Sequence, residues 1–86
     1  MDASVEQRLK RMIVERLFMR IEPEQIREDK SLMDDYGVDS VSLLELVVGI
    51  EEEFGIRVDD ADFSVENFAT IERLAAFVRE RMPGEA

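Results

Sequence analysis

The stretch Tyr36–Ile56, "YGVDSVSLLELVVGIEEEFGI", decides the fold of this 86-residue chain. From Ser40 to Phe54 the apolar residues recur with the period of an α-helix, and Gly55 stands where helices commonly end. At about 100° per residue, one set of them falls within a single arc and forms a core stripe. Its members are Leu43, Leu46, Val47, Ile50 and Phe54. We therefore predict a helix over about 40–54 that packs against other helices.

A second apolar stripe lies beside the first on the same predicted helix. Val41, Leu44 and Val48 stand at i, i+3 and i+7, between the core stripe and the polar arc. One helix of a small bundle does not usually need two apolar stripes. This stripe either packs under the preceding loop, through Tyr36 or Val38, or forms an exposed strip for a partner. The sequence leaves both interpretations open.

The rest of this helix is polar and strongly acidic. Its polar arc consists of Ser42, Glu45, Gly49, Glu52 and Glu53. A solvated face is the ordinary interpretation of the "EEE" run at 51–53. At a helix C-terminus, however, negative charge opposes the helix dipole. The run therefore indicates that these acids serve something beyond helix stability.

The segment before this stretch begins with a helix and continues as a long loop. Ser4 and Gln7 match a capping box, and apolar residues at helical spacing predict a helix over about 4–19. Pro23 and Gly37 favour turns, so we interpret residues 21–39 as a loop. It holds too many apolar residues for a free linker, and we expect it to be fixed to the core. They are Ile26, Leu32, Met33, Tyr36 and Val38.

In the segment after the central helix, the sequence predicts a short helical turn at about 59–67 and then a last helix. Thr70 is a typical N-cap, and Pro83 and Gly84 end the pattern. The apolar face between them is formed by Ile71, Leu74, Ala75, Val78 and Met82. We predict one all-α domain over 1–86, a small antiparallel bundle of three main helices plus one short helix, with a long first loop.

The composition narrows the function. The chain has neither cysteine nor histidine, which excludes thiolate chemistry, thiolate zinc sites and a Ser-His-Asp triad. We expect no catalytic residues and no metal site. The net charge is −10, and residues 21–62 carry fourteen acidic against three basic side chains. This charge disfavours nucleic acid, attracts basic partners and favours a monomer.

We expect a cytoplasmic protein that does not insert into membranes. The N-terminus lacks the apolar run of a signal peptide. No apolar run approaches the roughly 20 residues that span a bilayer.

The pair Asp39-Ser40 stands at the start of the central helix. Both residues are common helix caps, and capping alone would account for them. The alternative is that Ser40 carries a modification. A helix N-terminus suits a phosphoester, because its free N–H groups and the dipole favour an anion.

With these residues in view, "YGVDSVSLLELVVGIEEEFGI" resembles the central motif of acyl carrier proteins, a Gly-x-Asp-Ser step before an acidic helix. The resemblance extends to "FATIERLAAFV" and to the length of the chain. It implies that Ser40, preceded by Asp39, is esterified by 4′-phosphopantetheine, which a phosphopantetheinyl transferase delivers from coenzyme A. The chain would then be a phosphoprotein and a carrier, not an enzyme, with acyl groups held as thioesters on the cofactor's thiol.

The resemblance also implies a partner face on the central helix. The implied apolar positions are Val41, Leu44 and Val48, and the implied acidic positions are Glu45, Glu51 and Glu52. The implied partners are the transferase and the acyl-transferring and acyl-modifying enzymes of fatty acid, lipid or polyketide-type synthesis, with basic docking patches.

Several positions depart from the commonest fatty-acid pattern. Ser42 stands where an acid is frequent, Leu43 is bulkier than usual, and Tyr36 replaces a leucine. Gly49 costs the helix about 1 kcal/mol relative to alanine. These departures indicate a specialised member of the family.

Three alternatives compete with this interpretation. A peptidyl or aminoacyl carrier shares the fold but usually reads Gly-Gly-x-Ser, whereas this chain has Gly37-Val38-Asp39-Ser40. An unmodified acidic adaptor for a basic partner is the alternative from another class. A calcium-binding loop fails in the registers that start at Asp34 or Asp35, because apolar residues fall on ligand positions.

Overall fold

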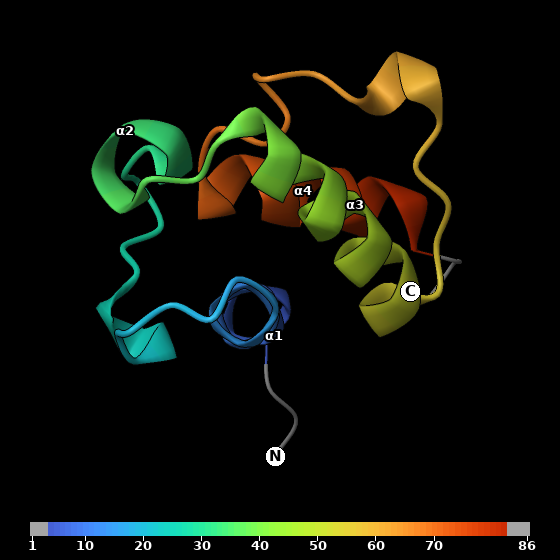
Figure 1. The fold of residues 1–86 in the computed structure, drawn as a ribbon. Helices are drawn as coiled ribbons and strands as arrows, with labels where there is room; N and C mark the ends of the chain where they lie inside the picture. The colour runs from blue at the N-terminus through green and yellow to red at the C-terminus, as the bar shows by residue number, and fades with distance from the viewer. Residues whose placement is uncertain (1–3, 83–86) are drawn as a thin grey trace.

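The computed structural model describes residues 4–82 as a bundle of helices, without a strand in that range (Figure 1). The elements are α1 (Val5–Arg16), the 3₁₀-helix η1 (Pro23–Gln25), α2 (Leu32–Tyr36), α3 (Ser40–Phe54), the 3₁₀-helix η2 (Asp60–Asp62) and α4 (Ile71–Arg81). The predicted all-α bundle is confirmed. The predicted end of the last helix at Pro83 and Gly84 lies outside the described residues.

Helix α1 begins as predicted and ends earlier. The Ser4 hydroxyl accepts from the Gln7 N–H at 3.1 Å, and the Gln7 side chain accepts from the Ser4 N–H at 3.0 Å. These two bonds form the capping box. The helix stops at Arg16, because Phe18 takes a left-handed conformation with φ 53° and the Met19 N–H returns to the Val14 carbonyl.

The long loop contains a short helix that the sequence analysis did not predict. Ser31 caps α2 by accepting from the Asp34 N–H at 3.0 Å, and Gly37 ends it at φ 72°. Five residues are too few to show a helical period, so α2 reads as a loop in the sequence. The Tyr36 hydroxyl, which accepts from the Arg27 N–H at 2.8 Å, ties this segment together. The short turn predicted at 59–67 is the 3₁₀-helix η2.

Helices α3 and α4 have the predicted starts. Asp39 caps α3, and Gly55 ends it in the left-handed region at φ 65°. The Thr70 hydroxyl caps α4 by accepting from the Arg73 N–H at 3.1 Å. Because each of these three boundaries carries its own capping residue, both ends of α3 and the start of α4 follow from local chemistry.

The core lies where α1, α3 and α4 meet, and α1 packs against both other helices. Its fully buried side chains include Leu9, Ile13, Ile26, Leu32, Leu46, Ile50, Phe68, Ile71, Leu74 and Val78. Ile26, Leu32 and Val38 come from the long loop, so its predicted attachment to the core is confirmed. No helix within residues 4–82 has the length and apolar character needed to cross a membrane.

Candidate functional site

The candidate site begins at the N-terminal end of α3, where two neighbouring residues take different roles. The Asp39 carboxylate accepts from the Ser42 N–H at 2.8 Å and so caps the helix. The hydrogen bonds from Ser42 hold the pKa of the Asp39 carboxyl below its usual range, and it stays ionised. Ser40 is the first residue of the helix, and its side chain is exposed. Capping therefore does not occupy the Ser40 hydroxyl.

The surroundings of Ser40 fit a phosphoester. An exposed serine hydroxyl can form an ester bond, and α3 is a full 15-residue helix with its dipole behind that hydroxyl. The neighbouring Asp39 carboxylate is also negatively charged, but it is directed toward the Ser42 N–H, from which it accepts a hydrogen bond. Within residues 4–82, histidine, cysteine, aspartate and glutamate side chains do not gather into a metal-binding group.

The second apolar stripe is exposed on the surface of α3. Val41, Leu44 and Val48 are 73%, 58% and 44% exposed. Val38, one of the two residues that could have covered them, is itself buried in the core. Of the two open interpretations, the structure supports the exposed strip.

A hollow of about 250 Å³ lies beside this strip. Leu44 shares its lining with Val47, Val58 and Phe63 and with two acids, Asp59 and Asp60. Phe63 is partly exposed there and contacts the buried Phe68 edge to face, with 5.5 Å between ring centroids. Phe63 could not be identified from the sequence, because no periodic pattern surrounds it.

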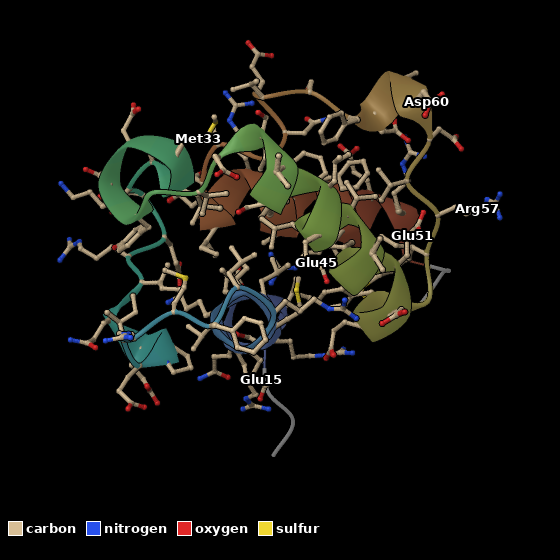
Figure 2. The ribbon with its side chains drawn as sticks, viewed as in Figure 1. Glu15, Met33, Glu45, Glu51, Arg57 and Asp60 are labelled. Atoms are coloured by element: carbon tan, nitrogen blue, oxygen red, sulfur yellow. The ribbon has the colours of Figure 1, made fainter. Side chains whose placement is uncertain are left out.

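The three acids predicted to face partners lie on different sides of α3. Figure 2 shows Glu45 on the side nearer α1 and Glu51 nearer the loop that carries Arg57. Glu51 is half-buried, and its carboxylate accepts from the Val58 N–H at 2.9 Å. Glu45 and Glu52 both form ion pairs with Arg16 of α1.

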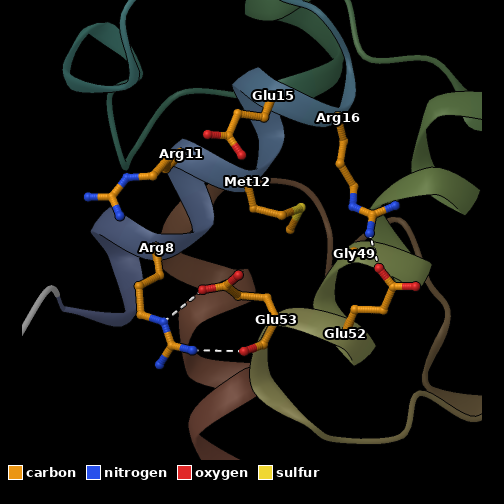
Figure 3. A pocket seen from close by; sticks show the side chains of 8 residues that line it. All are labelled: Arg8, Arg11, Met12, Glu15, Arg16, Gly49, Glu52 and Glu53. Carbon is orange, nitrogen blue, oxygen red and sulfur yellow. Dashed lines mark hydrogen bonds and ion pairs between the residues drawn. The ribbon is translucent and has the colours of Figure 1, made fainter.

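Gly49, which was predicted to lie on the polar arc of α3, is instead buried against α1. A Cβ atom at this position would lie 2.5 Å from the Met12 Sδ and 2.7 Å from the Arg16 Cδ. Angular counting assigns a residue to a face of the helix but cannot tell which neighbouring helix covers that face. Arg8 and Arg16, which extend from α1 toward this arc, were likewise not predicted (Figure 3).

Comparison with known proteins places these features in a family. Residues 7–78 match the family model described as "Phosphopantetheine attachment site". The acyl carrier protein of Zymomonas mobilis is 38% identical over 74 residues, which cover 86% of this chain and 90% of that one. The acyl carrier protein of Thermotoga maritima is 35% identical over 75 residues, which cover 87% and 88%.

A solved structure has a similar fold over most of this chain. The structure described as KstB-PCP(apo) superposes with a TM-score of 0.70 at 30% sequence identity, and the match covers 93% of this chain and 90% of that one. The region that matches the family model, residues 7–78, begins within α1 and ends within α4. A carrier protein therefore shares both the helical arrangement and the sequence pattern.

Proposed function

This chain belongs to the acyl carrier protein family, and we propose that Ser40 is the residue that carries its 4′-phosphopantetheine. The family's cofactor is covalently attached, and it needs a nucleophilic side chain that a transferase can reach. The exposed hydroxyl of Ser40, released from capping by Asp39, is the observation that carries this proposal. When attached, the cofactor supplies a terminal thiol that holds acyl groups, which this cysteine-free chain lacks.

The residues around Ser40 present it for modification. Asp39 fixes the first turn of α3, so the Ser40 hydroxyl projects from a rigid element and not from a mobile loop. In the loading reaction, the Ser40 oxygen forms a bond to phosphorus, and adenosine 3′,5′-bisphosphate leaves from coenzyme A. The serine proton goes to a base of the phosphopantetheinyl transferase.

The exposed strip of α3 is the proposed docking face for partner enzymes. Val41, Leu44 and Val48 offer apolar contact that runs away from Ser40 along the helix. Glu45, Glu51 and Glu52 add negative charge next to it, which steers basic surfaces toward the strip. The partners fitted by this face are acyl-transferring and acyl-modifying enzymes with basic docking patches, in fatty acid, lipid or polyketide-type synthesis.

A peptidyl or aminoacyl carrier is the second candidate, favoured by the structural likeness to KstB-PCP(apo). Two features favour the acyl carrier. The motif reads Gly37-Val38-Asp39-Ser40, with a single glycine, and the net charge is −10. The relatives at 35–38% identity are also named acyl carrier proteins. We accordingly treat residues 1–86 as one acyl carrier domain.

The test is to incubate the protein with coenzyme A and a broad-specificity phosphopantetheinyl transferase and to measure its intact mass. We expect a gain of one phosphopantetheine in the parent chain and none in Ser40→Ala. Ser42→Ala is the matched control, since it removes a serine hydroxyl two residues away, and it should still gain the mass. No gain in the parent chain would refute the carrier function, and a gain in Ser40→Ala would move the attachment site.

A further inference from the structure

On the side of α3 that faces α1, two acids of the proposed docking face, Glu45 and Glu52, are already paired with an arginine of α1. Glu45, Gly49 and Glu52 stand at i, i+4 and i+7 and therefore share one face of α3. The Arg16 guanidinium lies across this face. Its Nη1 donates to Glu45 at 2.9 Å, and its Nη2 donates to Glu52.

Gly49 is what lets Arg16 lie there. The Arg16 side chain passes so close to the α3 backbone that a Cβ on residue 49 would lie 2.7 Å from Cδ and 2.8 Å from Nε. Such distances are far below ordinary carbon contacts. The glycine, which weakens the helix by propensity alone, thus has a packing reason.

Arg8 provides a comparison, because it lines the same pocket between α1 and α3 as Arg16 (Figure 3). Arg8 donates to the Glu53 carboxylate at 2.9 Å and also to the Glu53 backbone carbonyl at 2.7 Å, and it stacks over the Phe54 ring. Arg16, in contrast, donates only to two side-chain carboxylates of α3 and to no backbone carbonyl of that helix. Another cation could replace Arg16 at these carboxylates without leaving a backbone group unpaired.

We propose that Arg16 determines partner specificity by occupying Glu45 and Glu52, so that a basic partner must displace it to reach these acids. The inference rests on the proposed carrier function. Enzymes that dock mainly through the apolar strip are then favoured over enzymes that need both acids. Glu45 and Glu52 remain partly exposed, at 48% and 66% of their side chains, so a competing guanidinium can approach them.

The cation at Arg16 is permanent. The hydrogen bond to Glu45, followed by the charge of Glu52, raises the pKa of Arg16 above its already high ordinary value. A change of pH in the neutral range therefore does not release the acids, and only a competing cation does.

The experiment uses a nona-arginine peptide as the probe and follows the backbone amide shifts of α3 by NMR during titration. In Arg16→Gln, the shifts near Glu45 and Glu52 should saturate at a peptide concentration about two- to five-fold lower than in the parent chain, the range expected for exposed ion pairs. Arg27→Gln is the matched control. It removes one positive charge from an exposed arginine elsewhere and should leave these shifts nearly unchanged.

Two further variants separate masking from a general effect on the fold. Gly49→Ala displaces both Arg16 and the nearer Met12 Sδ, so its helix content is checked by circular dichroism. If the fold is retained, it should tighten peptide binding in the same direction, although Arg16 is still present. Combining Arg16→Gln with Glu45→Gln and Glu52→Gln should abolish the gain. Equal affinity in Arg16→Gln and Arg27→Gln, or weaker binding in Arg16→Gln, would overturn the proposal.

The same variants are then loaded by the transferase, and kcat/KM for Ser40 modification is measured at low and high salt. Arg16→Gln should change kcat/KM for a transferase with a basic docking surface, with a larger change at low salt. If Ser40 is never modified, the carrier function fails while the peptide result still stands. If loading proceeds and the peptide affinities are equal, only the masking role fails.

Discussion

Helix α3 carries two apolar stripes of similar composition in opposite environments. Leu43, Leu46 and Ile50 are buried, whereas Leu44 and Val48, only a few residues away, are exposed. The difference lies in what stands opposite each stripe. The bundle covers the first, and nothing within residues 4–82 covers the second to that extent. The same residue type therefore serves stability on one side of the helix and, in our proposal, recognition on the other.

An exposed apolar stripe is unfavourable for a monomer unless it has a use. Apolar patches on monomers are normally small, and a continuous strip beside acids is typical of an interaction surface. The charge of the chain keeps such a strip soluble, because molecules of net charge −10 repel one another. Substitutions on each stripe show whether the buried stripe contributes to stability and the exposed stripe to recognition.

Leu46→Ala should have the largest effect. Leu46 is fully buried, so the lost transfer free energy and the cavity together should remove about 2–5 kcal/mol from the free energy of unfolding. A domain of this size has roughly 4–13 kcal/mol in total. Chemical denaturation measures the loss.

The matched control is Leu44→Ala, the same change on the exposed stripe. Its effect on stability should stay within about 0.5 kcal/mol. Equal losses for the two leucines would show that both stripes belong to the core, and the comparison would fail.

Val48→Asp should affect recognition and leave the fold intact. The charge enters a side chain that is 44% exposed, so the helix content in circular dichroism should not change. Desolvating the new carboxylate in an apolar interface should reduce acyl transfer by partner enzymes about tenfold, equal to about 1.4 kcal/mol. Unfolding of this variant would mean that Val48 is a core residue, and the docking proposal would then lose its support.

The sequence was sufficient for the features that depend on local chemistry. The two ends of α3 follow from helical periodicity, the cap at Asp39 and the glycine at 55. The second stripe follows from angular counting alone, because its members share an arc that the core does not need. The family followed from the Gly-x-Asp-Ser step, and the matches to carrier proteins confirm it.

Features that depend on tertiary contacts could not be predicted in this way. Arg16 and Glu45 are 29 positions apart, and nothing local to either residue indicates that they meet. Gly49 therefore appeared only as a helix-weakening departure, although it admits Arg16. Helix α2 was missed for another reason, since five residues contain too little periodicity to be distinguished from a turn.

Glu6→Gln tests how much an ion pair between α1 and α4, the helices that cover the buried stripe, contributes to stability. Glu6 of α1 accepts two hydrogen bonds from Arg79 of α4, at 2.8 and 2.9 Å. These bonds hold the pKa of the Glu6 carboxyl in the folded protein below its usual range. A lowered folded pKa gives stability that is complete above the unfolded pKa and is lost as the pH falls through the folded value.

Glu6→Gln should therefore lower the free energy of unfolding at pH 7 by about 0.5–1 kcal/mol, the range of an exposed pair with good geometry. The difference from the parent chain should shrink as the pH falls through the ordinary range of a glutamate carboxyl and then through the lowered folded pKa of Glu6. Glu80→Gln, an exposed carboxylate of the same helix as Arg79, is the control with the same charge change. A difference that stays constant down to acidic pH would mean that packing, not the ion pair, is responsible.

Phe18→Gly should have the smallest effect, and in the opposite direction. Phe18 ends α1 in the left-handed region at φ 53°, where α3 uses Gly55 at φ 65°. A non-glycine residue in this conformation destabilises the folded state by about 1–2 kcal/mol. Glycine removes this strain, but its greater freedom in the unfolded chain offsets about 0.5–1 kcal/mol of the gain. Phe18 is 88% exposed, so its removal loses little packing. We therefore expect the free energy of unfolding to rise by about 0.5 kcal/mol. Gly55→Ala should lose stability through backbone strain alone, because a Cβ atom at this position would have no other atom within 4 Å. A loss of stability in Phe18→Gly would mean that the aromatic ring, despite its exposure, holds the end of α1 over the buried stripe.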